Sequence, residues 1–418
     1  MPPVALIDGN DFYVSCERVF DRRLAGMPVL VLSNNDGCAI SRSAEAKALG
    51  VGMGEPTFRL RPLVRRHGIR VLSSNYPLYG DMSRRVNEAL AGFSPAVEAY
   101  SIDETFLDLA GFDGRDLWAY AQDLRATVRR WTGIPTCVGL GPTKTLAKLG
   151  NAVAKKNPAF GGVCDLTDER VRCAVLRALP VGDVWGVGPA TRRKLEGVGV
   201  TTAGGLAALD PKHARRLGTV VLERVAAELR GLACLDLDLL PAARQGVAVT
   251  RSFGQPLHDL APVVGAVAAF ATKAGEKLRA QGLIAGQLTA FLHTDRHRQG
   301  PQHHGSRTAR LVPMTADARD LAAAAGRCVE AAYRQGFAYA KAGVILDDLR
   351  LAGQAPLDLF ARPRSDALMR AVDAINARYG RGTVRVASMG FGAAWSPRAA
   401  HRSPAYTTRL KEVPRVRA

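Results

Sequence analysis

The stretch AYSIDETFLDL, residues 99–109, holds two adjacent carboxylates in a segment that otherwise has the apolar composition of a β-strand. Neighbouring side chains of a plain strand point to opposite faces, so either Asp103 or Glu104 would point into the core. Burying an unpaired carboxylate costs a free energy comparable with the whole stability of a domain. The chain must therefore expose one of these acids to water, or fold so that both face a cleft that holds positive charge.

Composition and charge limit the class of protein. The 418 residues are enough for about two to four domains. The formal net charge of +19 indicates a polyanionic partner, and nucleic acid fits it better than a membrane surface. No apolar run approaches the ~20 residues of a membrane span, and the N-terminus lacks the basic region of a signal peptide. We therefore expect no membrane partner and a cytoplasmic location, which the seven scattered cysteines also favour.

The order of the predicted elements indicates an α+β multidomain fold. Residues 1–165 mix strands and helices around a sheet, with one short helix over 62–67, and residues 168–231 read as short helices. Residues 247–349 read strand, helix, strand, strand, helix, strand, which suits a sheet with two helices on one face. A Pro- and Arg-rich tail begins at residue 351, and its ending, HRSPAYTTRLKEVPRVRA (residues 401–418), is expected to be mobile in the free chain.

A third acid, Asp8, ends the predicted strand VALID near the N-terminus. If that strand lies beside the hairpin that contains Asp103 and Glu104, the three carboxylates converge at one edge of the sheet. Carboxylates in such proximity repel one another unless cations neutralise them. Mg²⁺ suits the site, and two ions about 4 Å apart can clamp the attacking and leaving oxygens of a phosphoryl transfer. The alternative is a surface hairpin with ordinary solvated acids.

Basic side chains gather in two segments. In TKTLAKLGNAVAKK, Lys144, Lys148 and Lys155 recur at near-helical spacing, so they could share one broad face of a helix. In SRSAEAKALG, Arg42 and Lys47 precede a glycine. A triphosphate needs such donors, although lysines on a helix are most often only solvated.

The segment LPVGDVWGVGPATRRKLEGVGV predicts a helix-hairpin-helix. Gly186 and Gly188 allow a close approach of the backbone, and N–H groups at the start of the next helix can bind a DNA phosphate. Arg192 and Arg193 add positive charge, and contacts of this kind position nucleic acid without reading its sequence. The alternative is a glycine-rich helix connection that binds nothing.

Together these motifs resemble those of the Y-family DNA polymerases, the low-fidelity translesion class. DGNDFYVSCE, SIDETFLDL and GLGPTKTLAKLGNAVAKK are similar to the family's palm motifs. VLSNNDGCAISRSAEAKALGVGMGEP, SSNYPLYGDMSRRV and the C-terminal RGTVRVASMG…SPAYTTR resemble the UmuC type, found in DNA polymerase V, more than the DNA polymerase IV branch. The resemblance covers nearly the whole chain and implies an error-prone DNA-directed DNA polymerase of SOS mutagenesis and DNA repair.

The resemblance also implies roles for particular residues. Asp8, Asp103 and Glu104 match the metal-binding carboxylates, Asp103 and Glu104 being catalytic, and Gly9 would lend a main-chain carbonyl to one of two Mg²⁺ ions. The residues implied to contact the incoming dNTP are Tyr13, whose ring would exclude a ribose 2′-OH, and Ile40, Ser41, Lys47 and Lys155. The residues implied to bind primer-template DNA are Gly186, Gly188, Arg192 and Arg193.

The family's right-hand architecture implies a division of the chain into domains. The implied domains are a palm at 1–20 and 78–165, fingers at 21–77, a helix-hairpin-helix thumb at 166–234, a linker at 235–245, a little finger at 246–350, and a basic C-terminal region at 351–418. The little finger would lie in the DNA major groove. Its charge agrees, because residues 241–350 hold 14 Lys or Arg against 8 Asp or Glu.

Partners follow from the same resemblance: a dimer of a self-cleaved UmuD-like protein, a RecA filament, and the β sliding clamp, at the bacterial nucleoid. The expected clamp-binding residues are Leu357, Leu359 and Phe360, but Pro356 stands where the family has Gln, so we expect weakened clamp binding. The tail from 351 to 418, with 12 Lys or Arg against 4 Asp or Glu, is the expected UmuD-like contact or else a nonspecific DNA-binding tail.

Two other functions are weighed against the polymerase. A catalytically weak or inactive scaffold that binds DNA and the clamp would be expected to lose the acids, whereas this chain keeps Asp8, Asp103 and Glu104. A nucleotidyl cyclase, whose core resembles the palm, would not need the helix-hairpin-helix or a net charge of +19.

Overall fold

The computed structural model describes residues 2–112, 114–239, 244–354, 366–380, 382–390, 395–396 and 398–414. The chain forms two compact units. The first contains Met1–Ser33, Gly37–Pro241 and His401–Ala418, and the second contains Asn34–Asp36 and Ala242–Ala400. Among the described residues, no helix is both long and apolar enough to cross a membrane.

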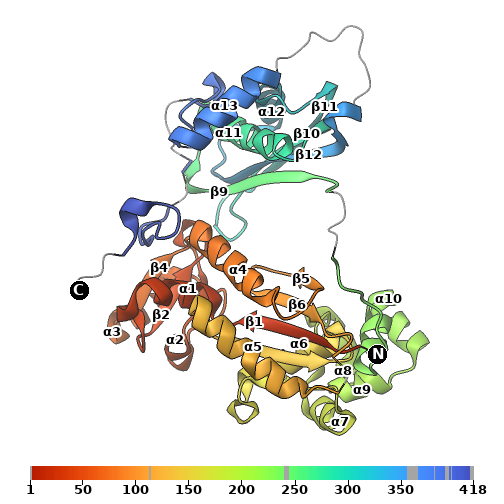
Figure 1. The fold of residues 1–418 in the computed structure, drawn as a ribbon. Coiled ribbons are helices and arrows are strands. Elements are labelled where there is room, and N and C mark those ends of the chain that lie inside the picture. The colour runs from red at the N-terminus through yellow and green to blue at the C-terminus, as the bar shows by residue number, and fades with distance from the viewer. Residues whose placement is uncertain are drawn as a thin grey trace. The chain divides into compact units, whose positions relative to one another are not determined.

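A five-stranded sheet in the first unit organises the N-terminal part of the chain (Figure 1). Its strands, in spatial order, are β5 (Val97–Ala99), β6 (Glu104–Asp108), β1 (Val4–Gly9), β7 (Thr136–Gly141) and β8 (Val163–Asp165). β1 takes the central place, antiparallel to both β6 and β7, because its four apolar side chains are buried on both faces.

Residues 99–109 are not one continuous strand. β5 ends at Ala99, residues 100–103 form the turn of the hairpin, and β6 begins at Glu104. The carboxylate side chain of Asp103 therefore belongs to the turn, and the face-to-face conflict expected for two acids in a plain strand does not arise. In this hairpin β5 ends before both acids, and β6 begins at Glu104, so only one of the two acids is part of a strand.

Helices cover both faces of this sheet. On one face, α1 (Phe12–Phe20), α4 (Tyr76–Leu90) and α5 (Leu117–Thr132) share a core with Ala5 and Ile7 of β1. On the other face, α6 (Lys144–Lys156) contributes Ala147 to a cluster with Val4 and Leu6. Successive side chains of β1 point to opposite faces of the sheet, so Ala5 and Ile7 are buried under one layer of helices and Val4 and Leu6 under α6.

The helix α6 lies unusually close to β7 because glycines meet at the crossing. A Cβ atom on Gly139 would overlap the Ala147 carbonyl oxygen and the Asn151 amide nitrogen, and Gly150 faces Gly139 across the contact. The Asn151 side chain then donates to the Cys137 carbonyl at 2.7 Å. This contact fixes the position of the helix that carries Lys155, a predicted site residue, and the two further lysines Lys144 and Lys148.

A smaller three-stranded sheet follows the first helix. Its order is β3 (Ala39–Arg42), β2 (Val29–Leu32) and β4 (Arg70–Ser73), with the helices α2 (Ala44–Ala48) and α3 (Thr57–His67) beside it. The helix expected to begin at Pro62 begins at Thr57 instead. Burial of Leu60 in the small core favours helix there, although Pro62 cannot donate its backbone hydrogen bond.

Helices follow the five-stranded sheet, as predicted. They are α7 (Glu169–Ala178), α8 (Pro189–Gly197), α9 (Ala203–Ala208) and α10 (Pro211–Leu229), and they share one apolar core with α6. The first three are short, whereas α10 has 19 residues and is interrupted at Gly218 and Thr219. Part of the predicted linker is held in place: the Asp238 backbone N–H donates to Glu98 at 2.9 Å, and Lys144 donates to the Asp236 carbonyl at 3.2 Å.

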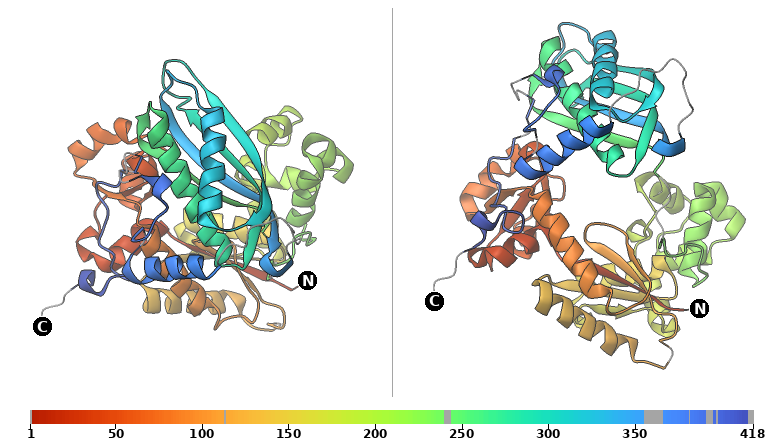
Figure 2. Two further views of the ribbon diagram at one scale, coloured as in Figure 1. Left: turned by 90° about the horizontal axis from the view of Figure 1, so that it is seen from above. Right: turned by 45° about the horizontal axis from the view of Figure 1, so that its top comes forward.

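The second unit has the predicted order of strands and helices (Figure 2). Its four strands lie in the order β11 (His304–Thr315), β10 (Leu283–Thr294), β12 (Tyr339–Leu351) and β9 (Val247–Leu257), packed with α11 (Leu260–Arg279) and α12 (Ala318–Ala332).

The described parts of the C-terminal tail are bound to the fold, so the expectation that the ending from residue 401 is mobile is wrong for its described residues. The helix α13 (Asp366–Tyr379) is joined to the second unit by Arg279 and Asp373 at 2.7 Å. The segment that begins at His401 belongs to the first unit, where the Ser73 backbone N–H donates to the His401 carbonyl at 3.0 Å. Buried polar groups on the fold supply partners that composition alone does not reveal.

The close approach of α6 to β7 yields a stability prediction. We expect Gly139→Ala to lower the free energy of unfolding by about 3 kcal/mol, because the added methyl group must push the helix off the sheet. The control is Gly80→Ala in α4, where a Cβ atom meets nothing within 4 Å and alanine favours the helix. Chemical denaturation measures both variants, and equal stability of the two would contradict the close contact.

Candidate active site

The three predicted acids gather at one end of the five-stranded sheet. Asp8, near the end of β1, lies directly opposite Glu104, the first residue of β6, in the antiparallel register. The backbone N–H of Gly9 donates to the Asp103 carbonyl at 2.9 Å, which joins the turn to the end of β1. Strand pairing alone therefore brings residues about a hundred positions apart to a single edge.

Asp8 lies in a strained electrostatic environment. Its Oδ2 atom pairs with Lys155 Nζ at 2.5 Å, while its Oδ1 atom is buried without a hydrogen-bond partner. Burial raises the pKa of Asp8 to about 6, Lys155 opposes the rise, and the charges of Asp103 and Glu104 add to it. A buried oxygen that lacks a partner, next to two further acids, is an atom at which a cation would be stabilised.

Glu104 is held by a lysine that sequence analysis did not assign to the site. Lys148 Nζ lies 2.7 Å from Glu104 Oε1, and its charge also lies 4.5 Å from the ring centre of Tyr100 and 5.2 Å from that of Trp185. The near-helical spacing of Lys144, Lys148 and Lys155 indicated a helix with basic side chains, but it did not indicate which acid Lys148 would pair with. Lys144 differs, since its charge is buried against Glu98 at 2.5 Å.

The donor set fits a hard divalent cation. Asp103, like the other two acids, offers carboxylate oxygens, and its Oδ1 accepts a hydrogen bond from Ser101 at 2.7 Å. In the described part of the chain, no group of three or more His, Cys, Asp or Glu side chains is already drawn together as a cation cage. The ammonium groups of Lys148 and Lys155 instead neutralise the acids, and a bound cation would have to replace them.

An aromatic cluster lies beside the first helix. The ring of Tyr13 stacks on that of Tyr79, with centroids 4.4 Å apart and planes at 13°, and Tyr76 contacts it edge-on. Burial raises the pKa of Tyr13, so its phenol stays protonated at neutral pH. Tyr13 is half-buried, so it is neither a wholly internal core residue nor a free surface ring.

The predicted nucleotide-contacting residues of the smaller sheet lie next to this helix. Ser41 Oγ accepts from the Val14 backbone N–H at 3.4 Å, which ties β3 to α1, and Ile40 is half-buried. Lys47 forms an ion pair with Asp11, a residue in the left-handed region at φ 47° that sequence analysis did not identify. The hydrogen bond and the ion pair thus place Ser41 and Lys47 beside the loop that joins Asp8 to α1.

The predicted helix-hairpin-helix has the expected turn. Gly186 has φ +88°, a conformation that favours glycine, and Gly188 is the N-cap of α8. Arg192 pairs with Glu196 at 2.7 Å on the exposed helix surface, and Arg193 is exposed. The predicted clamp-binding residues Leu357, Leu359 and Phe360 lie outside the described residues.

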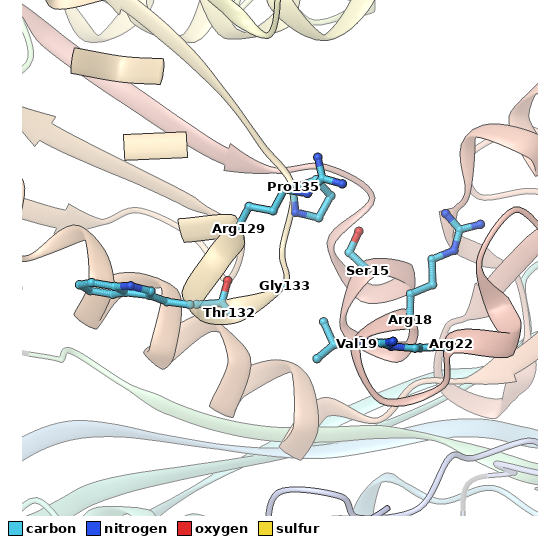
Figure 3. Close-up of a pocket in the computed structure, with 9 residues that line it drawn as sticks. Ser15, Arg18, Val19, Arg22, Arg129, Thr132, Gly133 and Pro135 are labelled. Atoms are coloured by element: carbon cyan, nitrogen blue, oxygen red, sulfur yellow. The ribbon is translucent and has the colours of Figure 1, made fainter. Parts of the chain in front are cut away.

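A separate hollow lies between α1 and the end of α5 (Figure 3). Its volume is about 650 Å³, and its lining includes Arg18, Arg22 and Arg129 but none of the predicted site residues. Arg18 is already engaged, since it pairs with Glu45 at 2.9 Å and donates to the Met27 carbonyl at 2.8 Å. The hollow is therefore a different feature from the acid site.

Comparison with known families matches most of the chain. Residues 7–152 match the impB/mucB/samB family, residues 244–359 match the C-terminal domain of that family, and residues 366–416 match a domain of unknown function.

Comparison with individual proteins also finds similarity to members of this family over nearly the whole chain. Protein UmuC of Salmonella typhimurium is 42% identical over 99% of this chain and 100% of its own length, and protein MucB of Escherichia coli is 41% identical over 98% of each chain. DNA polymerase IV of Caulobacter vibrioides is 29% identical over 91% of this chain and 92% of its own. A solved Y-family DNA polymerase chimera shares the fold, with a TM-score of 0.68 and 18% identity over 84% of this chain and 99% of that one.

The buried Asp8 carboxyl predicts a pH dependence of stability in metal-free buffer. The unfolded chain releases this proton near pH 3.8 and the folded chain near pH 6, so the folded state binds more protons between these values. Stability should therefore fall as pH rises from about 4 to about 6, by on the order of 3 kcal/mol from this group, and the contribution should then stay constant.

Asp8→Asn should remove this part of the pH dependence, whereas Asp123→Asn, at an exposed position of α5, should keep it. Denaturation at a series of pH values measures the effect. If the plot of stability against pH for Asp8→Asn runs parallel to that of the unaltered chain, burial does not raise the pKa of Asp8 and the prediction is wrong.

Proposed function

The chain belongs to the impB/mucB/samB family, and we propose that it is an error-prone DNA-directed DNA polymerase that copies damaged templates in SOS mutagenesis and DNA repair. The reaction is nucleotidyl transfer: the primer 3′-OH attacks the α-phosphorus of a dNTP, and pyrophosphate leaves. The observation that carries the proposal is the register of β1 and β6, which sets Asp8 opposite Glu104 with Asp103 in the adjoining turn. The retained acids argue against an inactive scaffold that only binds DNA and the clamp.

The acid site would hold two Mg²⁺ ions through the carboxylates of Asp8, Asp103 and Glu104 and the main-chain carbonyl of Gly9. The ions, when bound, would neutralise charge on the phosphates and on the attacking and leaving oxygens. The partnerless Oδ1 of Asp8 supports this assignment. The lysines Lys148 and Lys155 give up their carboxylate partners in that state, and Lys155 becomes available for the triphosphate.

Binding and selection of the dNTP are assigned to residues of α1, β3, α2 and α6. Lys47 and Lys155 bind the phosphates, Ser41 contacts them through its hydroxyl, and Ile40 roofs the nascent base pair. The ring of Tyr13 excludes a ribose 2′-OH, and its stacking on Tyr79 supports a fixed orientation.

Primer-template DNA would be held by two further regions. Gly186, Gly188, Arg192 and Arg193 would contact backbone phosphates, supported by the left-handed turn and the exposed arginine side chains. The excess of basic residues between 241 and 350 supports a DNA contact by the second unit.

We assign the domains as a palm at 1–20 and 78–165, fingers at 21–77, a thumb at 166–234, a little finger at 246–350 and a C-terminal region at 351–418. The separate three-stranded sheet supports the fingers, and the four-stranded sheet supports the little finger.

The proposed partners are a self-cleaved UmuD-like dimer, a RecA filament and the β sliding clamp, in the bacterial cytoplasm at the nucleoid. Similarity to UmuC and MucB proteins over nearly the whole chain supports the first two. The apolar side chains of Leu357, Leu359 and Phe360 support the third.

The catalytic assignment predicts the effect of one substitution. Asp103→Ala should lower primer extension by about a thousandfold, because one metal-binding carboxylate is lost, and should leave DNA binding nearly unchanged. Primer extension on intact and abasic templates measures it, with the UmuD-like partner and activated RecA present. Asp123→Ala, at an exposed position of α5, is the control. Extension by Asp103→Ala at the rate of the control would overturn the assignment.

Two adjacent lysines provide a sharper comparison for the triphosphate. Lys155 pairs with Asp8, whereas its neighbour Lys156 pairs with Asp183 at 2.7 Å on the surface. Lys155→Ala should raise the KM for dNTP by about tenfold to a hundredfold, as expected for the loss of a charged hydrogen bond. Lys156→Ala should change it by less than about twofold. Equal effects of the two variants would contradict the assignment of Lys155.

A further inference from the structure

One face of α1 carries three side chains that lead away from the nucleotide site. Tyr13, Glu17 and Phe20 follow one another at spacings of four and three residues, so they lie along one side of the helix. Glu17 is 1% exposed, and a buried carboxylate at such a place requires hydrogen-bond donors. One of the hydrogen-bond donors to Glu17 comes from Ser403, near the C-terminus.

Two hydroxyl groups donate to the same oxygen of Glu17. The Tyr79 hydroxyl lies 2.7 Å from Glu17 Oε1, and the Ser403 hydroxyl lies 3.0 Å from it. Tyr79 is fully buried, and its ring is the one that stacks on Tyr13. A single carboxylate therefore connects a C-terminal serine to the aromatic pair at the proposed nucleotide site.

Further contacts hold the C-terminal segment at this place, next to β4 and α1 (Figure 1). The Asn75 side chain, which is fully buried, donates to the Ser403 hydroxyl at 2.9 Å and to the Pro404 carbonyl at 3.1 Å. The Ser73 backbone and side chain exchange hydrogen bonds with the His401 backbone, each at 3.0 Å. The ring of Tyr406 stacks on Phe20 with centroids 4.9 Å apart.

This arrangement satisfies polar groups that the fold would otherwise bury without these partners. Without Ser403, Glu17 would lose one of its two hydroxyl donors, and Asn75 would lose an acceptor. The Tyr79 hydroxyl would then be the one remaining hydroxyl donor to the buried Glu17 carboxylate. Because the carboxylate would no longer be held from the side of Ser403, it could shift, and the Tyr79 ring bonded to it could shift as well. Any movement of that ring reaches Tyr13 directly, because the two rings are in contact.

We infer that the C-terminal segment 401–406 is a brace for nucleotide selection, in which Glu17 and Ser403 are positioning residues that hold Tyr79 and thereby fix the Tyr13 ring. The inference deepens the proposed function, since it rests on the role of Tyr13 at the sugar of the dNTP. It assigns the C-terminal segment a task in cis, in addition to any contact with partner proteins.

The experiment compares Ser403→Ala with Thr408→Ala in the full chain, with the partner proteins present. Thr408 is exposed two residues beyond this segment and serves as the matched control. The measured quantity is the ratio of dNTP to rNTP incorporation. Tyr13→Ala is the reference variant, because it removes the ring that is proposed to exclude the ribose 2′-OH. Ser403→Ala should lower the ratio by about threefold to tenfold, as expected for one hydrogen bond, and Ser403→Thr should restore it.

A second measurement does not depend on polymerase activity. Hydrogen exchange of the α1 amides should become faster in Ser403→Ala than in Thr408→Ala, because the braced helix face is loosened. If Tyr13→Ala lowers the ratio while Ser403→Ala changes neither the ratio nor the exchange, the brace is overturned and the proposed function stands. If Tyr13→Ala leaves the ratio unchanged, the role of Tyr13 fails, and the inference fails with it.

Discussion

The pairing of β1 with β6 is the interaction on which the site depends. It sets Asp8 opposite Glu104 and joins Gly9 to the Asp103 carbonyl at 2.9 Å, so the two paired strands and the turn before β6 bring the three acids together. The register is fixed because β1 is buried on both faces, and a slip by one residue would exchange the side chains packed against its two covering layers and separate Asp8 from Glu104. The chemistry of the chain therefore follows from the stability of one strand pair.

The charge at this edge must be balanced in the absence of metal ions, and α6 supplies the balance. Its lysines reach Asp8 and Glu104 because Gly139 allows the helix to lie close to the sheet. The burial that raises the pKa of Asp8 also makes a cation at its free oxygen favourable. In the function proposed above, Lys155 then turns from Asp8 to the phosphates of a bound nucleotide, so the same positive charge serves both states.

Much of the fold and the acid trio could be predicted from the sequence, because strand and helix periods and the family motifs are local signals. The pairing of Lys148 with Glu104 could not, since it depends on the height of α6 above the sheet, which the spacing of lysines does not encode. The docking of the C-terminal segment was missed for a similar reason. Its composition reads as a mobile tail, and its partner Glu17 lies 386 residues away in the sequence.

The most direct test of the account is a crystal structure of the full chain with primer-template DNA, a nonhydrolysable dNTP and Mn²⁺, in which anomalous scattering locates the metal. The account predicts Mn²⁺ bound by Asp8, Asp103 and Glu104, with Lys155 moved from Asp8 to the triphosphate. Mn²⁺ absent from these carboxylates, with Lys155 still paired to Asp8 while DNA and nucleotide are bound, would contradict it.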